Sequence, residues 1–132
     1  MKKLALVTIL MTTITMSCAQ SSNNDAFKTI EVDSFQQVLD SCADSCVLVD
    51  VRTLDEYNEA HLKGAVLIDV KEDNFKEKAL KLLPKNKTIM VYCRSGRRSA
   101  NAAGILATEG YKVINLEGGI SAWKDAGKKI IK

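Results

Sequence analysis

The sequence predicts a single α/β domain built on a mainly parallel sheet with helices on both faces. Short apolar runs alternate with segments of helical spacing from residue 27 to the end of the chain, which is the pattern of strands joined by crossover helices. The run over 47–51, Val-Leu-Val-Asp-Val, is almost continuously apolar, as expected of a strand covered on both faces. With 132 residues, the chain has room for one domain and a leader.

Local spacing predicts the elements in the first half of this domain. Residues 27–30 form a short strand, and Asp33 is expected to cap the next helix because Gln36 stands three residues later. Apolar residues recur on one face of that helix up to Cys42. The elements that follow are a strand over 47–51, a short helix over 53–60 and a strand over 65–68.

The second half repeats the alternation. Apolar residues at helical spacing predict a helix from Phe75 that ends before Pro84. Gly110 is the expected C-cap of an alanine-rich helix over 100–109. The remaining elements are strands over 88–92 and 112–115 and a final helix that opens at Gly118 and runs through Trp123.

The stretch Cys93-Arg94-Ser95-Gly96-Arg97-Arg98-Ser99 lies between the strand over 88–92 and the helix after it. A cysteine at the carboxyl end of a strand, below a helix N-terminus, meets unpaired backbone N–H groups and the positive end of a helix dipole. Arginines add to this field, so we expect a reactive thiolate with a pKa within about 3.5–7.5. A buried structural cysteine, the alternative, would leave the glycine and the arginines without a role.

The first residues have the layout of a secretory signal. A basic start at Lys2 and Lys3 precedes an apolar run that is too short to span a membrane. Ser17-Cys18 resembles the end of a bacterial lipobox, so we expect residues 1–17 to be removed and Cys18 to be lipidated. Ordinary cleavage after Ala19 is the alternative.

This interpretation divides the chain into a signal peptide over 1–17, a flexible tether over 18–26 and one domain over 27–132. The polar tether suits a spacer from a membrane. We expect the periplasmic face of a bacterial membrane, with the outer membrane favoured because Ala19 is not the aspartate associated with inner-membrane retention. A soluble periplasmic protein is the alternative. Loss of the signal lowers the formal charge from +3 to +1, which gives no basis for a nucleic-acid partner.

Cys42 and Cys46 need a separate explanation. An exported protein folds where disulfides can form, so a local disulfide is the first interpretation. Two buried thiols are the second, and a redox pair that resolves an oxidised Cys93 is the third. No metal site is expected, because His61 is the only histidine and is distant in sequence.

Four segments resemble the rhodanese family, as one rhodanese-homology domain over residues 27–130. They are Val49 to Arg52, Glu56-Tyr57 with His61 to Ala65, the Cys93 loop, and Leu116 to Trp123. The resemblance implies a doubly wound domain with a central five-stranded sheet. Ala60 departs from the family, which usually has glycine there, and is expected to alter only a turn.

The resemblance also implies a sulfurtransferase. Cys93 would take sulfane sulfur from a small anionic donor such as thiosulfate to form a persulfide, and a thiol or cyanide acceptor would remove it. Backbone N–H groups in the loop are suited to hold the anionic sulfur. No cofactor is expected. The expected anion-binding residues are Arg94, Ser95, Gly96, Arg97, Arg98, Ser99 and Arg52.

The arginines have different expected roles. Arg98 would bind anions and order the loop through its planar donor fork, whereas Arg94 and Arg97 would point outward and steer donors. Arg52 would line the pocket or pair with Glu56. The residues expected to be structural are Asp50, His61 and Trp123.

Two other function classes stay open. Cysteine-dependent phosphatases and arsenate-reductase-like enzymes related to this family use Cys-x5-Arg, whereas Cys93 to Arg98 is Cys-x4-Arg. The shorter loop is expected to form a smaller cradle that suits sulfur better than a phosphoryl group. A non-catalytic sulfur carrier or redox module would have the same loop.

Overall fold

Five parallel strands form the central sheet of this computed structural model, which describes residues 26–132. Their order across the sheet is β1-β5-β4-β2-β3, and every neighbouring pair is parallel. The strands are β1 Lys28–Ile30, β2 Cys46–Asp50, β3 Val66–Leu67, β4 Thr88–Tyr92 and β5 Val113–Leu116. The predicted signal peptide, Cys18 and the tether up to residue 25 lie outside the described residues.

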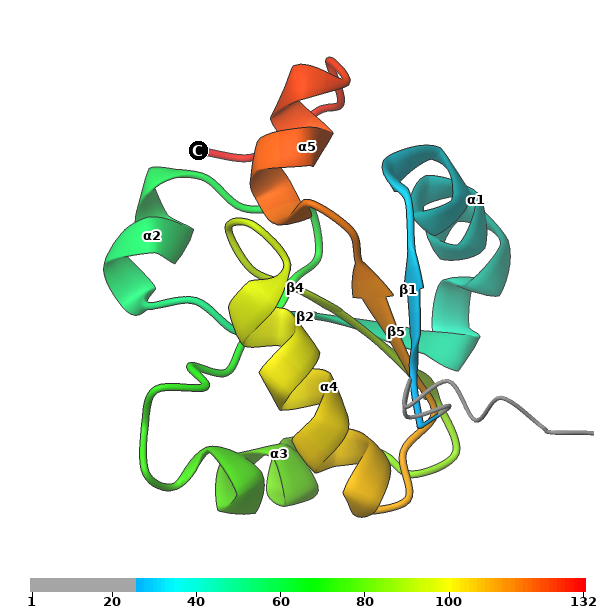
Figure 1. The fold of residues 1–132 in the computed structure, drawn as a ribbon, viewed down its shortest axis with the longest axis vertical. Helices are drawn as coiled ribbons and strands as arrows, with labels where there is room; N and C mark the ends of the chain where they lie inside the picture. Colours follow the sequence, from blue (N-terminus) through cyan, green and yellow to red (C-terminus); the bar gives the residue numbers. More distant parts are fainter. Residues whose placement is uncertain (1–25) are drawn as a thin grey trace, which may run out of the picture.

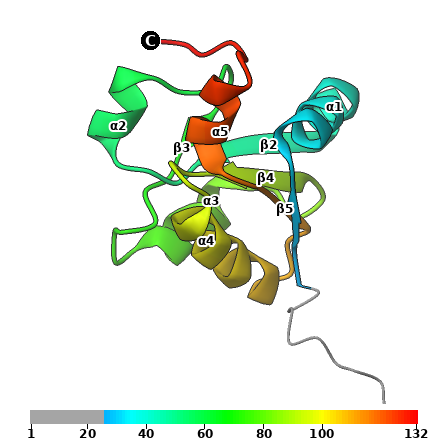
Figure 2. The same cartoon turned by 45° about the horizontal axis from the view of Figure 1, so that its top comes forward.

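Helices cover both faces of the sheet (Figures 1 and 2). One face carries α1 Val32–Cys42 with the 3-10 turn Ala43–Ser45, α2 Leu54–Glu59 and α5 Gly119–Asp125. The other face carries α3 Phe75–Leu82 and α4 Arg97–Thr108. The predicted doubly wound α/β class is confirmed, with a sheet that is parallel throughout.

The side chains of β4 alternate between two buried cores. Ile89 and Val91 pack with residues of α3 and α4, whereas Met90 and Tyr92 pack with residues of α1 and α5. All four side chains are fully buried. The alternation follows from the two-residue period of a strand, and burial on both faces explains why this strand has an almost continuous apolar sequence.

Two helix starts differ from the prediction. α4 begins at Arg97 and not at residue 100, because Gly96 has a φ of 98° and turns the chain directly into the helix. α1 begins at Val32 with Glu31 as its N-cap, and no side chain caps it. The prediction that Asp33 is the N-cap was wrong: Asp33 lies in the first turn, where the helix dipole favours an acidic side chain.

The carboxyl ends of the parallel strands meet at one edge of the sheet, where ligands bind in folds of this class. Cys93 follows β4 and Arg52 follows β2 at this edge. Among residues 26–132, no helix has the length and apolar character that a membrane span requires.

Candidate active site

The sulfur of Cys93 lies at the bottom of the loop between β4 and α4. Cys93 is 1 % exposed, and its Sγ accepts two hydrogen bonds. The backbone N–H of Gly96 donates at 3.0 Å, and the hydroxyl of Ser99 donates at 3.3 Å. Gly96 precedes α4 and Ser99 lies in its first turn, so the start of this helix supplies both donors.

These donors decide the ionisation of Cys93. Burial of the sulfur raises the pKa of the thiol, but the Ser99 hydroxyl and the backbone N–H groups of Ser99, Gly96 and Ser95 lower it. The donors prevail, and the pKa of Cys93 lies below its ordinary value. A thiolate is the nucleophilic form of cysteine, so this environment prepares Cys93 for attack on an electrophilic sulfur.

Gly96 fits a position that a side chain would strain. Its φ of 98° lies in the left-handed region, which glycine adopts without a steric penalty. A Cβ at this position would lie 3.3 Å from both the backbone nitrogen of Gly118 and the carbonyl oxygen of Leu116. The loop therefore packs directly on the segment that leads into α5.

The start of α5 holds the backbone of the Cys93 loop. The N–H of Ile120 donates to the carbonyl of Cys93 at 2.8 Å, and the N–H of Ser121 donates to the carbonyl of Arg94 at 3.1 Å. A Cβ on Gly119 would clash with both carbonyls. The Gly118-Gly119 pair, which the sequence showed only as a helix opening, thus permits close contact between α5 and the loop.

Arg98 joins the first turn of α4 to α2 through Glu56. Its two terminal nitrogens donate to the two carboxylate oxygens of Glu56 at 2.7 and 2.8 Å. The Arg98 hydrogen bond is the main reason that the pKa of Glu56 falls to about 2. Arg98, which was expected to order the loop, therefore has Glu56 as a defined partner. Pairing with Glu56 was one of the two roles expected of Arg52.

Arg52 lies in a separate buried network. Its guanidinium donates to both carboxylate oxygens of Asp50, with the shortest contact at 2.7 Å, and to the carbonyl of Ala60 at 2.6 Å. Arg52 is 4 % exposed, and the Tyr92 hydroxyl also donates to Asp50. The predicted pairing of Arg52 with Glu56 was wrong, because Arg52 pairs with Asp50 and Glu56 pairs with Arg98. The other expected role, lining the anion pocket, stays a prediction.

The loop side chains face different surroundings. Arg94, Ser95 and Arg97 are exposed, so the two arginines place positive charge on the surface around the Cys93 loop. Arg98 is half-buried and Ser99 is fully buried. Of the predicted set, the structure brings Gly96 and Ser99 into contact with the sulfur, and the contacts of Arg98 are with Glu56.

Asn115 belongs to the surroundings of the loop and was missed by sequence reasoning. It is 2 % exposed on β5, and its Nδ2 lies 3.4 Å from the carbonyl of Gly96. Its buried Oδ1 has no hydrogen-bond partner among the described residues. An asparagine inside an apolar strand is the signal that could have found it, since a buried amide requires partners.

The residues expected to be structural have structural contacts. His61 Nδ1 lies 2.9 Å from the carbonyl of Tyr57, and the two rings stack at 3.8 Å. Ala60 has extended backbone with a φ of −169°, which any residue adopts, so the family's glycine is not needed there. Trp123 packs in the core with 6 % exposure.

The cysteines divide into two kinds. A disulfide joins Cys42 to Cys46, and Cys93 is the free cysteine within residues 26–132. Over that same range, no group of three or more histidine, cysteine, aspartate or glutamate side chains is placed to hold a metal ion. The Cys93 sulfur, with hydrogen bonds from Gly96 and Ser99, is the nucleophile that the geometry offers at the site.

Known proteins are similar to this chain in sequence. The family model described as Rhodanese-like domain matches residues 31–126. "Putative sulfur carrier protein YrkF" of Bacillus subtilis is 38% identical over 104 residues, which are 78% of this chain but only 54% of that protein. "Thiosulfate sulfurtransferase PspE" of Escherichia coli is 40% identical over 73 residues, which are 54% of this chain and 68% of that protein.

A solved structure extends the agreement to three dimensions. The rhodanese-like domain protein from Staphylococcus aureus is 31% identical to this chain with a TM-score of 0.67. The match covers 80% of this chain and 100% of that one. The chain spans about half of the length of the Bacillus subtilis relative.

Proposed function

Because this chain belongs to the family of rhodanese-like domains, we propose that it is a sulfurtransferase that carries sulfane sulfur on Cys93. The observation that carries the proposal is the Cys93 sulfur, which accepts hydrogen bonds from Gly96 and Ser99 at the start of α4. Two curated relatives, one named as a thiosulfate sulfurtransferase and the other as a sulfur carrier, support this class of chemistry.

In the first step the Cys93 thiolate attacks the outer, sulfane sulfur of thiosulfate. A new S–S bond forms at Cys93, the S–S bond of thiosulfate breaks, and sulfite leaves with the bonding electron pair. Attack needs the thiolate, which the hydrogen-bond donors favour by lowering the pKa of Cys93. The exposed Arg94 and Arg97 attract the dianionic donor to the loop.

The loop then holds the Cys93 persulfide. Its terminal sulfur is anionic and extends beyond Sγ into the turn lined by the N–H groups of Ser95, Gly96 and Ser99, the same groups that lower the pKa of Cys93. Preorganised backbone donors stabilise a negative sulfur at low reorganisation cost. In the second step the acceptor, a thiolate or cyanide, attacks the terminal sulfur, and the thiolate of Cys93 is regenerated.

The Glu56–Arg98 ion pair gives the loop its rigidity. It ties α4, which supplies the donors, to α2 on the opposite face of the sheet. Since Glu56 neutralises Arg98, the net positive charge that a donor meets comes from Arg94 and Arg97. We therefore assign to Arg98 a positioning role and to the outer arginines the attraction of anions.

A sulfur carrier is the second candidate. The name of the Bacillus subtilis relative favours it. Carrier and enzyme share the persulfide and differ only in whether an acceptor turns it over. A phosphatase is disfavoured, because the Cys93–Arg98 loop has the shorter Cys-x4-Arg spacing.

Steady-state thiocyanate formation from thiosulfate and cyanide tests the enzyme assignment. We expect multiple turnovers that Cys93→Ser abolishes while circular dichroism shows an unchanged fold. A persulfide that forms once but is not turned over by cyanide or by small thiols would replace the enzyme with the carrier. Hydrolysis of a phosphate ester that depends on Cys93 would overturn both.

We also propose that the chain is exported and anchored by lipid at Cys18, on the periplasmic face of a bacterial membrane, with the outer membrane as the favoured site. The signal layout of residues 1–17 supports this, as does the Cys42–Cys46 disulfide, since disulfides persist in oxidising compartments. Fractionation of cells that produce the Cys18→Ala variant is the test. Movement from the membrane to the soluble periplasmic fraction is expected, and a wild-type distribution would contradict lipidation.

A further inference from the structure

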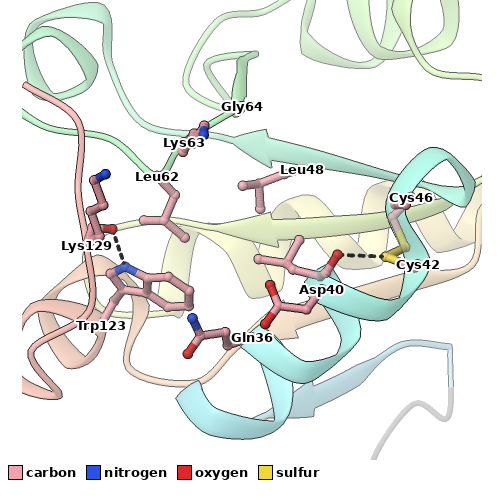
Figure 3. Close-up of a pocket in the computed structure, with 12 residues that line it drawn as sticks. Gln36, Asp40, Cys42, Cys46, Leu48, Leu62, Lys63, Gly64, Trp123 and Lys129 are labelled. Atoms are coloured by element: carbon pink, nitrogen blue, oxygen red, sulfur yellow. Dashed lines mark hydrogen bonds between the residues drawn. A yellow bond between two sulfur atoms is a disulfide. The ribbon is translucent and has the colours of Figure 1, made fainter.

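A pocket of about 410 Å³ lies away from the Cys93 loop, on the sheet face covered by α1 and α5 (Figure 3). Its lining comes from α1, the 3-10 turn after it, the start of β2, the segment 62–64, α5 and the C-terminal segment that contains Lys129. It includes no residue of the Cys93 loop. This volume lies within the usual range for small-molecule sites, about 300–1,000 Å³. Nothing in the proposed sulfur transfer uses it.

The Cys42–Cys46 disulfide forms one end of this pocket (Figure 3). Both cysteines line the pocket and are only partly buried. The ring that the disulfide closes contains Ala43, whose φ of 34° is in the left-handed region that alanine rarely adopts.

The rest of the pocket suits a small zwitterion. Leu48, Leu62 and Trp123 supply an apolar floor. Lys63 and Lys129 lie toward the end of the pocket away from the disulfide, while Asp40 lies on the disulfide side (Figure 3). Within the described part of the chain, none of these three charged groups has an ion-pair partner.

We propose that this pocket binds a low-molecular-weight peptide thiol and that the Cys42–Cys46 disulfide oxidises it. Carboxylates of the ligand would pair with Lys63 and Lys129, its ammonium group with Asp40, and its thiol would face the disulfide. The disulfide selects this class of ligand, because a thiol is the group that exchanges with it. The opposite charges at the two ends fix the orientation of the ligand.

The exchange is balanced without a further reactant. A ligand thiolate attacks one sulfur of the disulfide, a ligand–protein S–S bond forms, the Cys42–Cys46 bond breaks, and the released cysteine takes a proton. A second ligand thiolate attacks the ligand sulfur of this mixed disulfide, which releases the ligand disulfide and leaves the second cysteine as a thiol. The two ligand thiols lose two electrons, and the protein disulfide accepts them.

The test uses the full chain with Cys18→Ser and Cys93→Ser, so that only Cys42 and Cys46 can react and the result does not depend on the proposed sulfur transfer. Glutathione is the peptide-thiol probe, and 2-mercaptoethanol is the neutral thiol for comparison. Mass spectrometry after alkylation measures how fast protein thiols appear. Each rate is divided by the concentration of the thiolate form of the reagent. We expect the rate with glutathione to saturate and to exceed that with 2-mercaptoethanol by roughly tenfold, as two weak charge pairs would give.

Lysine variants complete the test. Lys63→Ala with Lys129→Ala should remove the preference for glutathione and leave the rate with 2-mercaptoethanol unchanged, which also shows that the fold and the disulfide are intact. Lys124→Ala is the matched control, because Lys124 is exposed on α5 and does not line the pocket. A glutathione rate that rises linearly with concentration, or that the lysine pair does not affect, would overturn the proposal.

Discussion

The guanidinium of Arg98 and the carboxylate of Glu56 meet through two hydrogen bonds of 2.7 and 2.8 Å. One residue lies in the first turn of α4 and the other in the first turn of α2, so the pair connects helices on opposite faces of the sheet. The donors to the Cys93 sulfur come from the start of α4. The position of these donors therefore depends on an ion pair that does not itself contact the sulfur.

Replacing Glu56 by Gln removes the charge of this pair. We expect the KM for thiosulfate to rise by roughly tenfold, about 1.4 kcal/mol, because α4 loses its tie to α2 and the donors are less well positioned. Steady-state kinetics of thiocyanate formation measure this. Glu59→Gln is the matched control, since Glu59 is exposed on the same helix; equal effects of the two variants would refute a positioning role for Glu56.

The same pair predicts a pH dependence of stability. The pKa of Glu56 is lowered from 4.5 to about 2 by Arg98, so the ionised carboxylate stabilises the folded state. This stabilisation is complete above pH 4.5 and is lost as the pH falls through about 2. In urea unfolding, the difference between the wild type and Glu56→Gln should be constant near neutral pH and shrink below pH 4.5, and a difference that grows on acidification would contradict the assignment.

Replacing Ser99 by Ala removes the hydroxyl donor to the Cys93 sulfur. A hydrogen bond to a charged group contributes about 1.5–3 kcal/mol, so the pKa of Cys93 should rise when this donor is lost. The pH profile of iodoacetamide alkylation measures this pKa. Ser95→Ala is the control, because Ser95 contributes its backbone N–H and not its hydroxyl, and its profile should match that of the wild type.

Gly96 and Gly104 form a matched pair for a backbone test. Alanine at Gly96 meets the backbone of Leu116 and Gly118 at a φ of 98°, so we expect a loss of roughly 1–3 kcal/mol in the free energy of unfolding, together with loss of transfer activity. A Cβ at Gly104, within α4, meets nothing within 4 Å. Gly104→Ala should therefore stabilise the protein by about 0.5–1 kcal/mol; similar effects at both positions would refute the close packing of the loop.

Arg52→Met separates a structural role of Arg52 from a role in the anion site. Loss of the guanidinium leaves the fully buried Asp50 carboxylate without its charged partner, and an unpaired buried charge destabilises a fold by about 3–5 kcal/mol. We expect this loss in urea unfolding, with an unchanged KM for thiosulfate in the fraction that remains folded. A raised KM with unchanged stability would show instead that Arg52 contributes to anion binding.

The sequence was sufficient for the parts of the site that depend on local order. An apolar run followed by Cys93 and Gly96 places a thiol at the end of a strand and before a helix, because both signals lie in adjacent residues. The partners of the arginines depend on packing. Asp50 and Glu56 are both near Arg52 in sequence, so the sequence does not decide which of them Arg52 pairs with. The position of α2 in the fold brings Glu56 to Arg98.

Asn115 and the pocket beside the disulfide also depend on contacts between distant segments, which the sequence does not reveal. Asn115 reaches Gly96 because β5 lies next to β4, a neighbour relation that periodicity does not encode. The Cys42–Cys46 spacing suggested a disulfide, but the residues opposite it in the pocket come from segments up to 87 residues away in sequence, counted from Cys42 to Lys129. Contacts between distant segments are therefore where the structure adds to the sequence.

Mass spectrometry of the protein after brief treatment with thiosulfate tests the central claim most directly. The account predicts one added sulfur atom, located on the peptide that contains Cys93, released as thiocyanate by cyanide and absent in Cys93→Ser. An unchanged mass for protein whose Cys93 still reacts with iodoacetamide would contradict it. So would an added sulfur located on Cys42 or Cys46.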